Sequence, residues 1–272
     1  MNAFRAQPLA ELRAAPHTSV SAISCWIRCS AQFNHRYVLH TPPSHRPAAL
    51  AFGSAIHSAL ATFYEHLKDH GEKPPVDLLH ETFAGRMDVE VADTSIPLLL
   101  DDDQDAGQLK DMGVAMLTVF HEQGLVPDGR VVGVEVPFSV DLADPETGVV
   151  GDVPMVGAID AIVVHGKRTL LLEHKTAGKR FAADRLQNDI QPTAYAFASR
   201  SLGILRPGLA FQVLLKSRKP CVEVLPVERT EGQVMEMLET VAAVLKGVEA
   251  GVFFRQRSWA CGGCQFRYRC DG

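Results

Sequence analysis

The chain has 272 residues, of which 46% are hydrophobic and 22% are charged, and it carries a formal net charge of −5 at pH 7. This length can bury one large core or two small ones, and the composition is that of an ordinary globular protein. The negative charge disfavours a general nucleic-acid coat protein, and the sequence has no apolar run of about 18 residues that would predict a membrane span.

The first half of the chain is predicted to be helical. We expect residues 1–17 to form a poorly structured lead, after which Ser21 or Thr18 is a candidate N-cap for a helix running to about Tyr37. The spacing of apolar residues predicts three further helices: Ala48 to His70, Val76 to about Val91, and Gln104 to Gln123. Because Met1 to Pro16 lack a basic segment followed by an apolar one, we also expect a cytosolic protein with reduced cysteines.

From about Arg130 the pattern changes to strands rich in β-branched and aliphatic residues. Five strands are predicted: Val131 to Val140, Pro154 to Val164, Arg168 to Leu172, Leu209 to Lys216, and Cys221 to Pro226. The second and third should form a hairpin with Gly166 and Lys167 in its turn. Two helices are predicted around the last two strands: Ala183 to Ser201 and Thr230 to Val248. This order of elements predicts an α/β core.

The predicted hairpin carries two carboxylates. Asp160 lies within its first strand, and Glu173 and Lys175 follow its second strand. Because the strands are neighbours, the carboxylates can converge on one point, where together with carbonyl or water oxygens they would suit Mg²⁺ or Mn²⁺. Lys175 points to the same face as Glu173 and can orient a water molecule or neutralise a phosphate, as metal-assisted phosphodiester hydrolysis requires. The plainer alternative is a surface Glu173–Lys175 salt bridge, which would contribute little.

The order of Asp160, Glu173 and Lys175 resembles the motif of the PD-(D/E)xK nuclease superfamily. Upstream, Gly53 followed by His57 resembles the G-x-x-x-H element of RecB/AddB-like and CRISPR-adaptation nucleases within that superfamily. The resemblance implies that His57 is a third metal ligand beside the two carboxylates.

Further residues take a role from the same resemblance. Gln191 and Tyr195 resemble the Q-x-x-x-Y element that follows the catalytic lysine, which implies a place in the catalytic site, and they share one helix face. The main-chain carbonyl of His174 is implied as a metal ligand, whereas its side chain is expected to be structural. Glu135 matches a glutamate of these relatives that supports the site or contacts the substrate, and the alternative is a solvent-facing strand residue.

The implied fold class is α/β with a restriction-endonuclease-like core, which is a mixed central sheet flanked by helices. Three parts are expected along the chain. Residues 18–128 would form a helical part carrying Cys29 and His57, residues 129–250 the nuclease core, and residues 251–272 a C-terminal cysteine segment.

Three of the six cysteines lie within ten residues near the end of the chain: Cys261, Cys264 and Cys270. This spacing is typical of a metal or cluster site rather than of disulfides. Together with Cys29 it resembles the iron–sulfur arrangement of the same nucleases, which implies a structural [4Fe–4S] cluster joining the two chain ends. Two alternatives stay open. The spacing alone also suits zinc, and Cys25 is a second candidate for the fourth ligand because Ser30 follows Cys29 where the relatives have proline.

Arginines and aromatic residues surround these C-terminal cysteines. The arginines are Arg255, Arg257, Arg267 and Arg269, and the aromatic residues are Phe253, Phe254, Trp259, Phe266 and Tyr268. Such a mixture suits contact with the backbone of a nucleic-acid single strand and stacking on its bases. The alternative is that the aromatic rings only pack over the cysteine site.

From about Ser19 to Cys270, the resemblance implies a Mg²⁺- or Mn²⁺-dependent DNA exonuclease acting on single-stranded ends. Recombination, repair, phage DNA metabolism and CRISPR spacer processing are the settings it implies, in a bacterial, archaeal or phage-infected cytosol. A helicase, recombinase or CRISPR-adaptation protein is an implied partner, and a helicase would be separate because this sequence has no Walker-type GxxxxGK[ST] motif. The alternative function is a non-catalytic DNA-end-binding accessory subunit that keeps the fold and the cluster.

Overall fold

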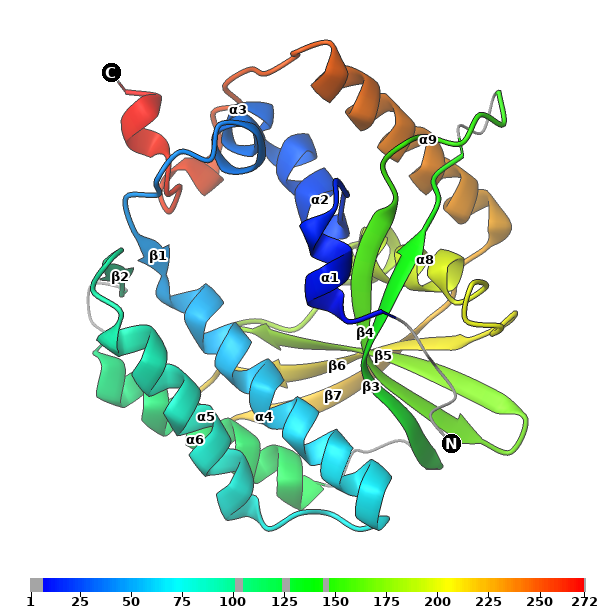
Figure 1. Ribbon diagram of the computed structural model, residues 1–272. Coiled ribbons are helices and arrows are strands. Elements are labelled where there is room, and N and C mark those ends of the chain that lie inside the picture. The colour runs from blue at the N-terminus through cyan, green and yellow to red at the C-terminus, as the bar shows by residue number, and fades with distance from the viewer. Residues whose placement is uncertain (1–6, 101–104, 124–127, 144–146, 272) are drawn as a thin grey trace.

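A five-stranded sheet lies between two layers of helices (Figure 1). The structure is a computed structural model that describes residues 7–100, 105–123, 128–143 and 147–271. The strands lie side by side in the order of the chain: β3 (Arg130–Val140), β4 (Met155–His165), β5 (Arg168–Ala177), β6 (Gly208–Leu215) and β7 (Cys221–Val227). Neighbouring strands are antiparallel except β5 and β6, which are parallel. The predicted mixed sheet flanked by helices is therefore confirmed.

Three helices cover one face of the sheet: α4 (Ala48–His70), α5 (Val76–Ala92) and α6 (Ala106–Gln123). Their aromatic side chains, among them Phe52, Phe63, Phe83 and Phe120, form one core with sheet residues such as Ala161 and Leu172. The bounds predicted for α4 are confirmed at both ends. It follows Pro47 and is terminated by Gly71, whose φ of +76° is the left-handed conformation that favours glycine after a helix. Gln104, where the third helix was expected to begin, lies outside the described residues.

The other face is covered by α2 (Val20–Arg28), α8 (Ile190–Ala198) and α9 (Glu231–Glu249). These helices form a second core with residues from β3, β4, β5 and β6. α9 begins at a capping box, in which the Thr230 hydroxyl accepts from the Gln233 N–H and the Gln233 side chain accepts from the Thr230 N–H. Side chains from helices on both faces of the sheet therefore contact residues of the central strands β4 and β5.

Two helices that were predicted to be continuous are each interrupted once in the structure, so their predicted bounds are wrong. The first starts after Ser19, not Ser21 or Thr18, and breaks at Cys29, after which come α3 (Ser30–Phe33) and a π-helical turn (Asn34–Val38). The helix expected over 183–201 divides at Asp189 into α7 (Ala183–Asn188) and α8. Both breaks are held by contacts from residues distant in the sequence, which are described below.

The N-terminal lead is more ordered than predicted. It contains α1 (Leu9–Ala14), which contacts β3 and β4, and Thr18 forms an isolated parallel bridge with Met155. The hydrogen bonds from Thr18 N–H to the Pro154 carbonyl and from Val156 N–H to the Thr18 carbonyl are both 2.9 Å long. These bonds fix the start of α2 against the edge of β4.

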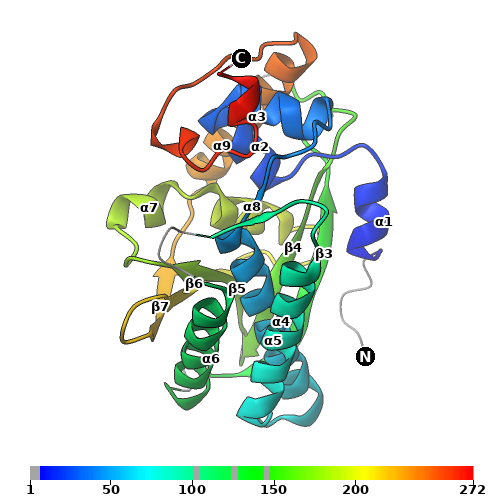
Figure 2. The same cartoon turned by 90° about the vertical axis from the view of Figure 1, so that its left-hand side faces the viewer.

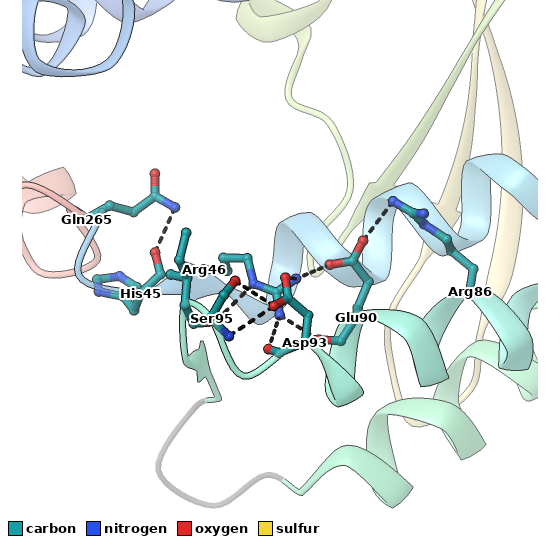
Figure 3. Close-up of polar contacts among 8 residues, drawn as sticks. His45, Arg46, Arg86, Glu90, Asp93, Ser95 and Gln265 are labelled. Carbon is teal, nitrogen blue, oxygen red and sulfur yellow. Dashed lines mark hydrogen bonds and ion pairs between the residues drawn. The ribbon is translucent and has the colours of Figure 1, made fainter. Parts of the chain in front are cut away.

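The C-terminal segment, which we define as residues 252–271, folds back over α2 and α3 (Figure 2). It contains two 3₁₀ turns, Trp259–Cys261 and Arg267–Arg269. It also forms two hydrogen bonds with the loop that leads into α4. The Gln265 carbonyl accepts from the Ser44 N–H (3.0 Å), and the Gln265 side chain donates to the His45 carbonyl (2.9 Å) (Figure 3). The C-terminal segment is thus fixed to the loop that leads into α4.

A polar network secures the same end of α4 from the other side. Arg46 belongs to a two-residue strand, β1 (Arg46–Pro47), that pairs with β2 (Leu98–Leu99). Its guanidinium binds the Glu90 carboxylate and the Asp93 carbonyl (2.9 Å) at the end of α5, and Glu90 also binds Arg86 (Figure 3).

Among the described residues, no helix has the length and apolar character needed to cross a membrane.

Candidate active site

The candidate site lies where β4 and β5 separate. Their antiparallel ladder begins at the hairpin turn and ends with the pair Ala161–Leu172. Beyond this pair β4 continues alongside β3 as far as Met155, whereas β5 continues alongside β6 as far as Ala177. Asp160 and Glu173 are the next residues on the two strands, so both carboxylates lie at the point of divergence.

Asp160 is held in a buried position at this point, with 7% of its surface exposed. Its Oδ2 atom accepts a hydrogen bond of 2.6 Å from the His174 N–H and lies 3.7 Å from Nδ1 of His57. Burial raises the pKa of the Asp160 carboxyl well above its usual value, and the negative charges of Glu173 and Glu135 raise it further. A divalent cation placed among these groups would relieve that repulsion.

His57 and Glu135 complete a group of possible metal ligands with Asp160. One ligand atom from each lies within 4.8 Å of the other two, the only such group in the described parts of the chain. Burial lowers the pKa of His57, which favours the neutral imidazole that binds metals. The donor set of two carboxylates and one imidazole, beside the His174 main chain, suits a hard divalent cation.

Glu135 reaches this group through an unusual backbone conformation. It lies between Val134 and Val136, whose partners on β4 are Ala161 and Ile159, so it is opposite Asp160. Its φ of +46° is in the left-handed region, which costs a non-glycine residue about 1–3 kcal/mol and is concentrated at functional sites. The side chain is exposed, yet enough protein surrounds the carboxyl that desolvation, followed by the charge of Glu173, raises its pKa.

Glu173 is 4% exposed and makes its direct contacts on the side of α8. One carboxylate oxygen accepts from the Lys175 ammonium and the other from the Tyr195 hydroxyl. That hydroxyl also lies 2.7 Å from the Ala158 carbonyl oxygen and 3.5 Å from Nε2 of Gln191. The structure therefore joins Gln191, Tyr195, Glu173 and Lys175 into one hydrogen-bonded chain, while His57 approaches from α4 on the opposite face.

The protonation states in this chain are set by opposing effects. Burial acts to lower the pKa of Lys175, but the Glu173 carboxylate and, less strongly, the charges of Asp189 and Asp160 outweigh it and raise the pKa. Burial raises the pKa of Tyr195 well above its usual value, and the charges of Asp160 and Glu173 add to the effect. The ammonium and the phenol therefore both stay protonated and act as hydrogen-bond donors.

The His174 side chain lies away from the two carboxylates, as expected. Its ring is buried and stacked on Tyr64 with ring centres 5.1 Å apart, and the Tyr64 hydroxyl donates to Oε1 of Gln212 at 3.0 Å. Burial lowers the pKa of His174 well below its usual value, and the Lys175 charge adds to this effect, so the ring is neutral. The His174 N–H donates to Oδ2 of Asp160, so this main chain lies beside the candidate ligands.

Arg229 is a residue near the site that the sequence did not reveal. It precedes α9, and its guanidinium donates to the Thr193 hydroxyl (2.8 Å) and to the carbonyls of Leu186 (2.8 Å) and Asp189 (3.0 Å). These bonds secure the junction of α7 with α8 and hence the helix that carries Gln191 and Tyr195. No local pattern could have indicated this, because Arg229 lies some forty positions after its partners.

A second site brings together the predicted cysteines. Cys29, Cys261, Cys264 and Cys270 line one pocket, and none of the six cysteines of the chain forms a disulfide. Burial raises the pKa of the Cys264 thiol. Cys25, the alternative fourth ligand, is instead buried against Ala22 and Phe33.

Ser30 joins the two ends of the chain at this pocket. Its hydroxyl accepts from the Phe254 N–H (2.8 Å) and lies 3.3 Å from the Phe254 carbonyl oxygen, which also accepts from the Ala31 N–H (3.1 Å). Serine at this position, where the resembling nucleases have proline, is therefore used as a link to the C-terminal segment. These contacts also explain why the helix predicted to reach Tyr37 breaks at Cys29.

Residues 17–271 match the family model described as the PD-(D/E)XK nuclease superfamily. Among solved structures, the chain is similar to a crystal structure from Eubacterium rectale named "Putative exonuclease", with a TM-score of 0.57 and 13% sequence identity over 95% of this chain and 91% of that chain. A likeness to SSO0001 covers 87% of this chain and 90% of that chain at 12% identity, and its TM-score of 0.37 is too low to carry an argument. The comparison with curated proteins found no match.

Proposed function

Because this chain belongs to the PD-(D/E)XK nuclease superfamily, we propose that it is a Mg²⁺- or Mn²⁺-dependent exonuclease that hydrolyses DNA from single-stranded ends. The observation that carries the proposal is that Asp160 lies beside Glu173 and its partner Lys175 where β4 and β5 diverge. The name of the similar Eubacterium rectale structure agrees with exonuclease activity. Recombination, repair, phage DNA metabolism and CRISPR spacer processing, beside a separate helicase or recombinase, are the settings we propose for it.

His57, Asp160 and Glu135 have ligand atoms within 4.8 Å of one another. Glu173 lies outside that group, bound by Lys175 and Tyr195, and in our proposal Glu173 and the main-chain carbonyl of His174 would also hold the cation. When bound, the cation would polarise the phosphate and lower the pKa of an attacking water. Burial, followed by the charges of Glu173 and Glu135, raises the pKa of Asp160, and this crowding of carboxylates fits a site for a positive ion.

Lys175 and Tyr195 act on the same reaction from the protein side. The Lys175 ammonium is fixed by Glu173 and supplies a positive charge where the scissile phosphate gains negative charge. The Tyr195 hydroxyl donates a hydrogen bond to the other carboxylate oxygen of Glu173. The Tyr195 ring packs edge-on against Phe138, with ring centres 6.2 Å apart. Gly157 leaves room for this packing, since a Cβ atom there would lie 2.5 Å from the Phe138 ring.

The direct test is to incubate the purified protein with end-labelled linear single strands, linear duplexes and circular single strands. We expect Mn²⁺ to support shortening of the linear single strand from its end, and EDTA to stop it. The circular strand should stay intact because it has no end. A protein that binds these DNAs and cleaves none of them would instead be the non-catalytic accessory subunit, although a chain that keeps Asp160, Glu173 and Lys175 together argues against that function.

The proposal includes a structural [4Fe–4S] cluster held by Cys29, Cys261, Cys264 and Cys270 in a cytoplasmic compartment. One tetrahedral zinc ion would need its four sulfurs within about 4 Å of one another, because each Zn–S bond is about 2.3 Å long. Among the described residues the four thiols do not form a group within 4.8 Å, although they line one pocket. A cluster, which spaces its ligands more widely than a single ion, fits this arrangement better.

Replacing Cys29 with alanine should remove the cluster, whereas Cys25→Ala should retain it. Cys29 lines the pocket, and Cys25 is packed in a separate apolar cluster. We expect the wild type and Cys25→Ala to be brown, with iron and sulfide in equal amounts, and Cys29→Ala to be colourless and less soluble because the chain ends lose their link. Stoichiometric zinc in the wild type, or loss of iron from Cys25→Ala alone, would contradict the assignment.

Arg229→Ala should slow cleavage because the helix carrying Tyr195 loses its anchor. Misplacement of a catalytic group can lower the rate by up to about 10²-fold, so we expect a loss on the order of 10-fold in kcat and partial recovery in Arg229→Lys. The matched control is Arg200→Ala, which removes an exposed ion pair between the turn after α8 and Glu231 at the start of α9. In a Tyr195→Phe background the Arg229→Ala effect should shrink, and an equal loss in both backgrounds would show that Arg229 acts on some other part of the protein.

A further inference from the structure

The C-terminal segment carries a charge opposite to that of the whole chain. Four arginines and one aspartate give residues 252–271 a net charge of +3, whereas the chain as a whole carries −5. Asp271 pairs with Arg257 (2.8 Å) and Arg267 (3.0 Å), and within the described residues Arg255 and Arg269 form no ion pair. Alongside burial, the charges of Arg269 and Arg255 lower the pKa of His35, so the positive field extends over the surface nearby.

The five aromatic residues of the segment divide into two groups. Three have ring partners in the rest of the fold: Phe253 packs on Phe33, Phe254 meets the edge of Trp26, and Phe266 stacks on His35. The other two are exposed. Trp259 is 92% exposed and, in the described part of the chain, packs on no other aromatic ring, and Tyr268 is 47% exposed. Packing over the cysteine pocket therefore accounts for only part of this aromatic content.

Both exposed rings are presented by a fixed backbone. The 3₁₀ turn of Trp259 is capped by Ser258, whose hydroxyl accepts from the Ala260 N–H at 3.3 Å. The Tyr268 hydroxyl donates to the Pro42 carbonyl at 2.8 Å, and the Arg269 guanidinium lies 5.1 Å from the centre of its ring. The Tyr268 ring, held in this way, loses little conformational entropy when a flat ligand stacks on it, whereas Trp259 is fixed only through its backbone.

The segment is also attached beside the helix that carries His57. Gln265 binds Ser44 and His45, and α4 begins three residues later at Ala48 (Figure 3). His57 is nine residues into α4, which at 1.5 Å per residue corresponds to about 14 Å along the helix. The segment is therefore attached directly to the loop that leads into the helix carrying His57.

We propose that the C-terminal segment is a docking surface for single-stranded DNA, with Trp259 and Tyr268 stacking on bases and Arg255 and Arg269 contacting phosphates. A single strand offers both the flat faces and the negative charge that this surface complements. A duplex hides its base faces, so it satisfies only the charge. This inference deepens the proposed function, because it assigns the strand that would supply the active site, but binding can be measured without cleavage.

The test is the affinity of the cluster-containing protein for a fluorescein-labelled oligothymidylate, measured by anisotropy in EDTA so that no hydrolysis occurs. Stacking contributes about 1–3 kcal/mol per base, so Trp259→Ala should weaken binding by about 5- to 150-fold. Arg269→Gln should lower the slope of log K against log salt by about 0.7, the value for one phosphate contact on a single strand. Leu205→Ala, which removes a side chain that is 79% exposed on a different loop, is the matched control and should bind as the wild type does.

A second readout uses the small number of tryptophans. The chain has two, and Trp26 packs against Phe254 and Gly247, so quenching of tryptophan emission by the oligonucleotide should disappear in Trp259→Phe. If Trp259→Ala binds the oligonucleotide as tightly as the wild type, the proposal is overturned and the surface is better suited to a protein partner. Equal affinity for a duplex of the same sequence would also overturn it. If binding depends on Trp259 but no DNA is cleaved, the docking surface stands and the proposed nuclease function fails.

Discussion

Asp160→Asn should abolish both DNA cleavage and Mn²⁺ binding without unfolding the protein. Asparagine keeps an oxygen that can accept the 2.6 Å hydrogen bond from the His174 N–H, so the local backbone is preserved. The change removes the charge that a cation needs. It also removes a buried carboxylate whose pKa is raised by burial and by Glu173 and Glu135, so we expect the melting temperature to stay the same or rise.

Three measurements on Asp160→Asn distinguish this expectation from a folding defect. Calorimetry should show loss of Mn²⁺ binding, the cleavage rate should fall by at least about 10³-fold, and DNA affinity should be unchanged or tighter because one negative charge near the phosphate is gone. The matched control is Asp152→Asn, an exposed aspartate in the chain leading to β4. Normal turnover in Asp160→Asn would mean that the carboxylates where β4 and β5 diverge are not the catalytic site.

Most of the secondary structure could be predicted because the signals are local. The bounds of α4 follow from a regular spacing of apolar residues between Pro47 and Gly71, and proline before a helix and glycine after it are both local signals. The hairpin of β4 and β5 follows in the same way from two apolar runs around Gly166. Adjacent strands lie about 4.8 Å apart, and Asp160 and Glu173 come directly after the last pair of this hairpin, so the hairpin brings them near each other before the strands diverge.

The features that could not be predicted depend on partners distant in the sequence. The break after α2 depends on Ser30, whose hydroxyl bonds with Phe254, 224 positions later. The division of the next long helix at Asp189 depends on the Arg229 guanidinium, which takes up carbonyls at the end of α7. Neither residue changes the local pattern of apolar residues, so a window of the sequence shows one continuous helix in each case.

Part of the candidate site also lay beyond local reasoning. The sequence indicated Glu135 only by resemblance, because a glutamate within an apolar strand pattern is compatible with a solvent-facing position. What brings its carboxylate to within 4.8 Å of His57 and Asp160 is the positive φ of the backbone and the register of β3 against β4. The hydrogen bond from Tyr195 to Glu173 also could not be predicted from a local window, because it forms only when α8 is anchored over the sheet.

Lys175→Ala should leave metal binding intact and cause kcat to collapse. A protonated lysine is not a ligand for hard cations, and the Glu173 charge keeps the ammonium protonated despite burial. Glu173 retains its hydrogen bond from Tyr195 in the variant, so the carboxylate stays in place. What disappears is a positive charge beside the phosphate, and charge stabilisation that develops in the transition state acts on kcat rather than on ground-state binding.

The expected loss for Lys175→Ala is on the order of 10²–10³-fold in rate, with Mn²⁺ affinity by calorimetry and DNA affinity by anisotropy close to those of the wild type. Lys110→Ala is the matched control, because it removes an exposed ion pair with Asp88 between α5 and α6. An exposed pair contributes under about 1 kcal/mol to stability and should not affect the rate at all. An unchanged cleavage rate in Lys175→Ala would mean that the Glu173–Lys175 pair, like the Lys110–Asp88 pair, has no catalytic role. The nuclease mechanism would then lack the group that distinguishes this site from a simple cation-binding cluster.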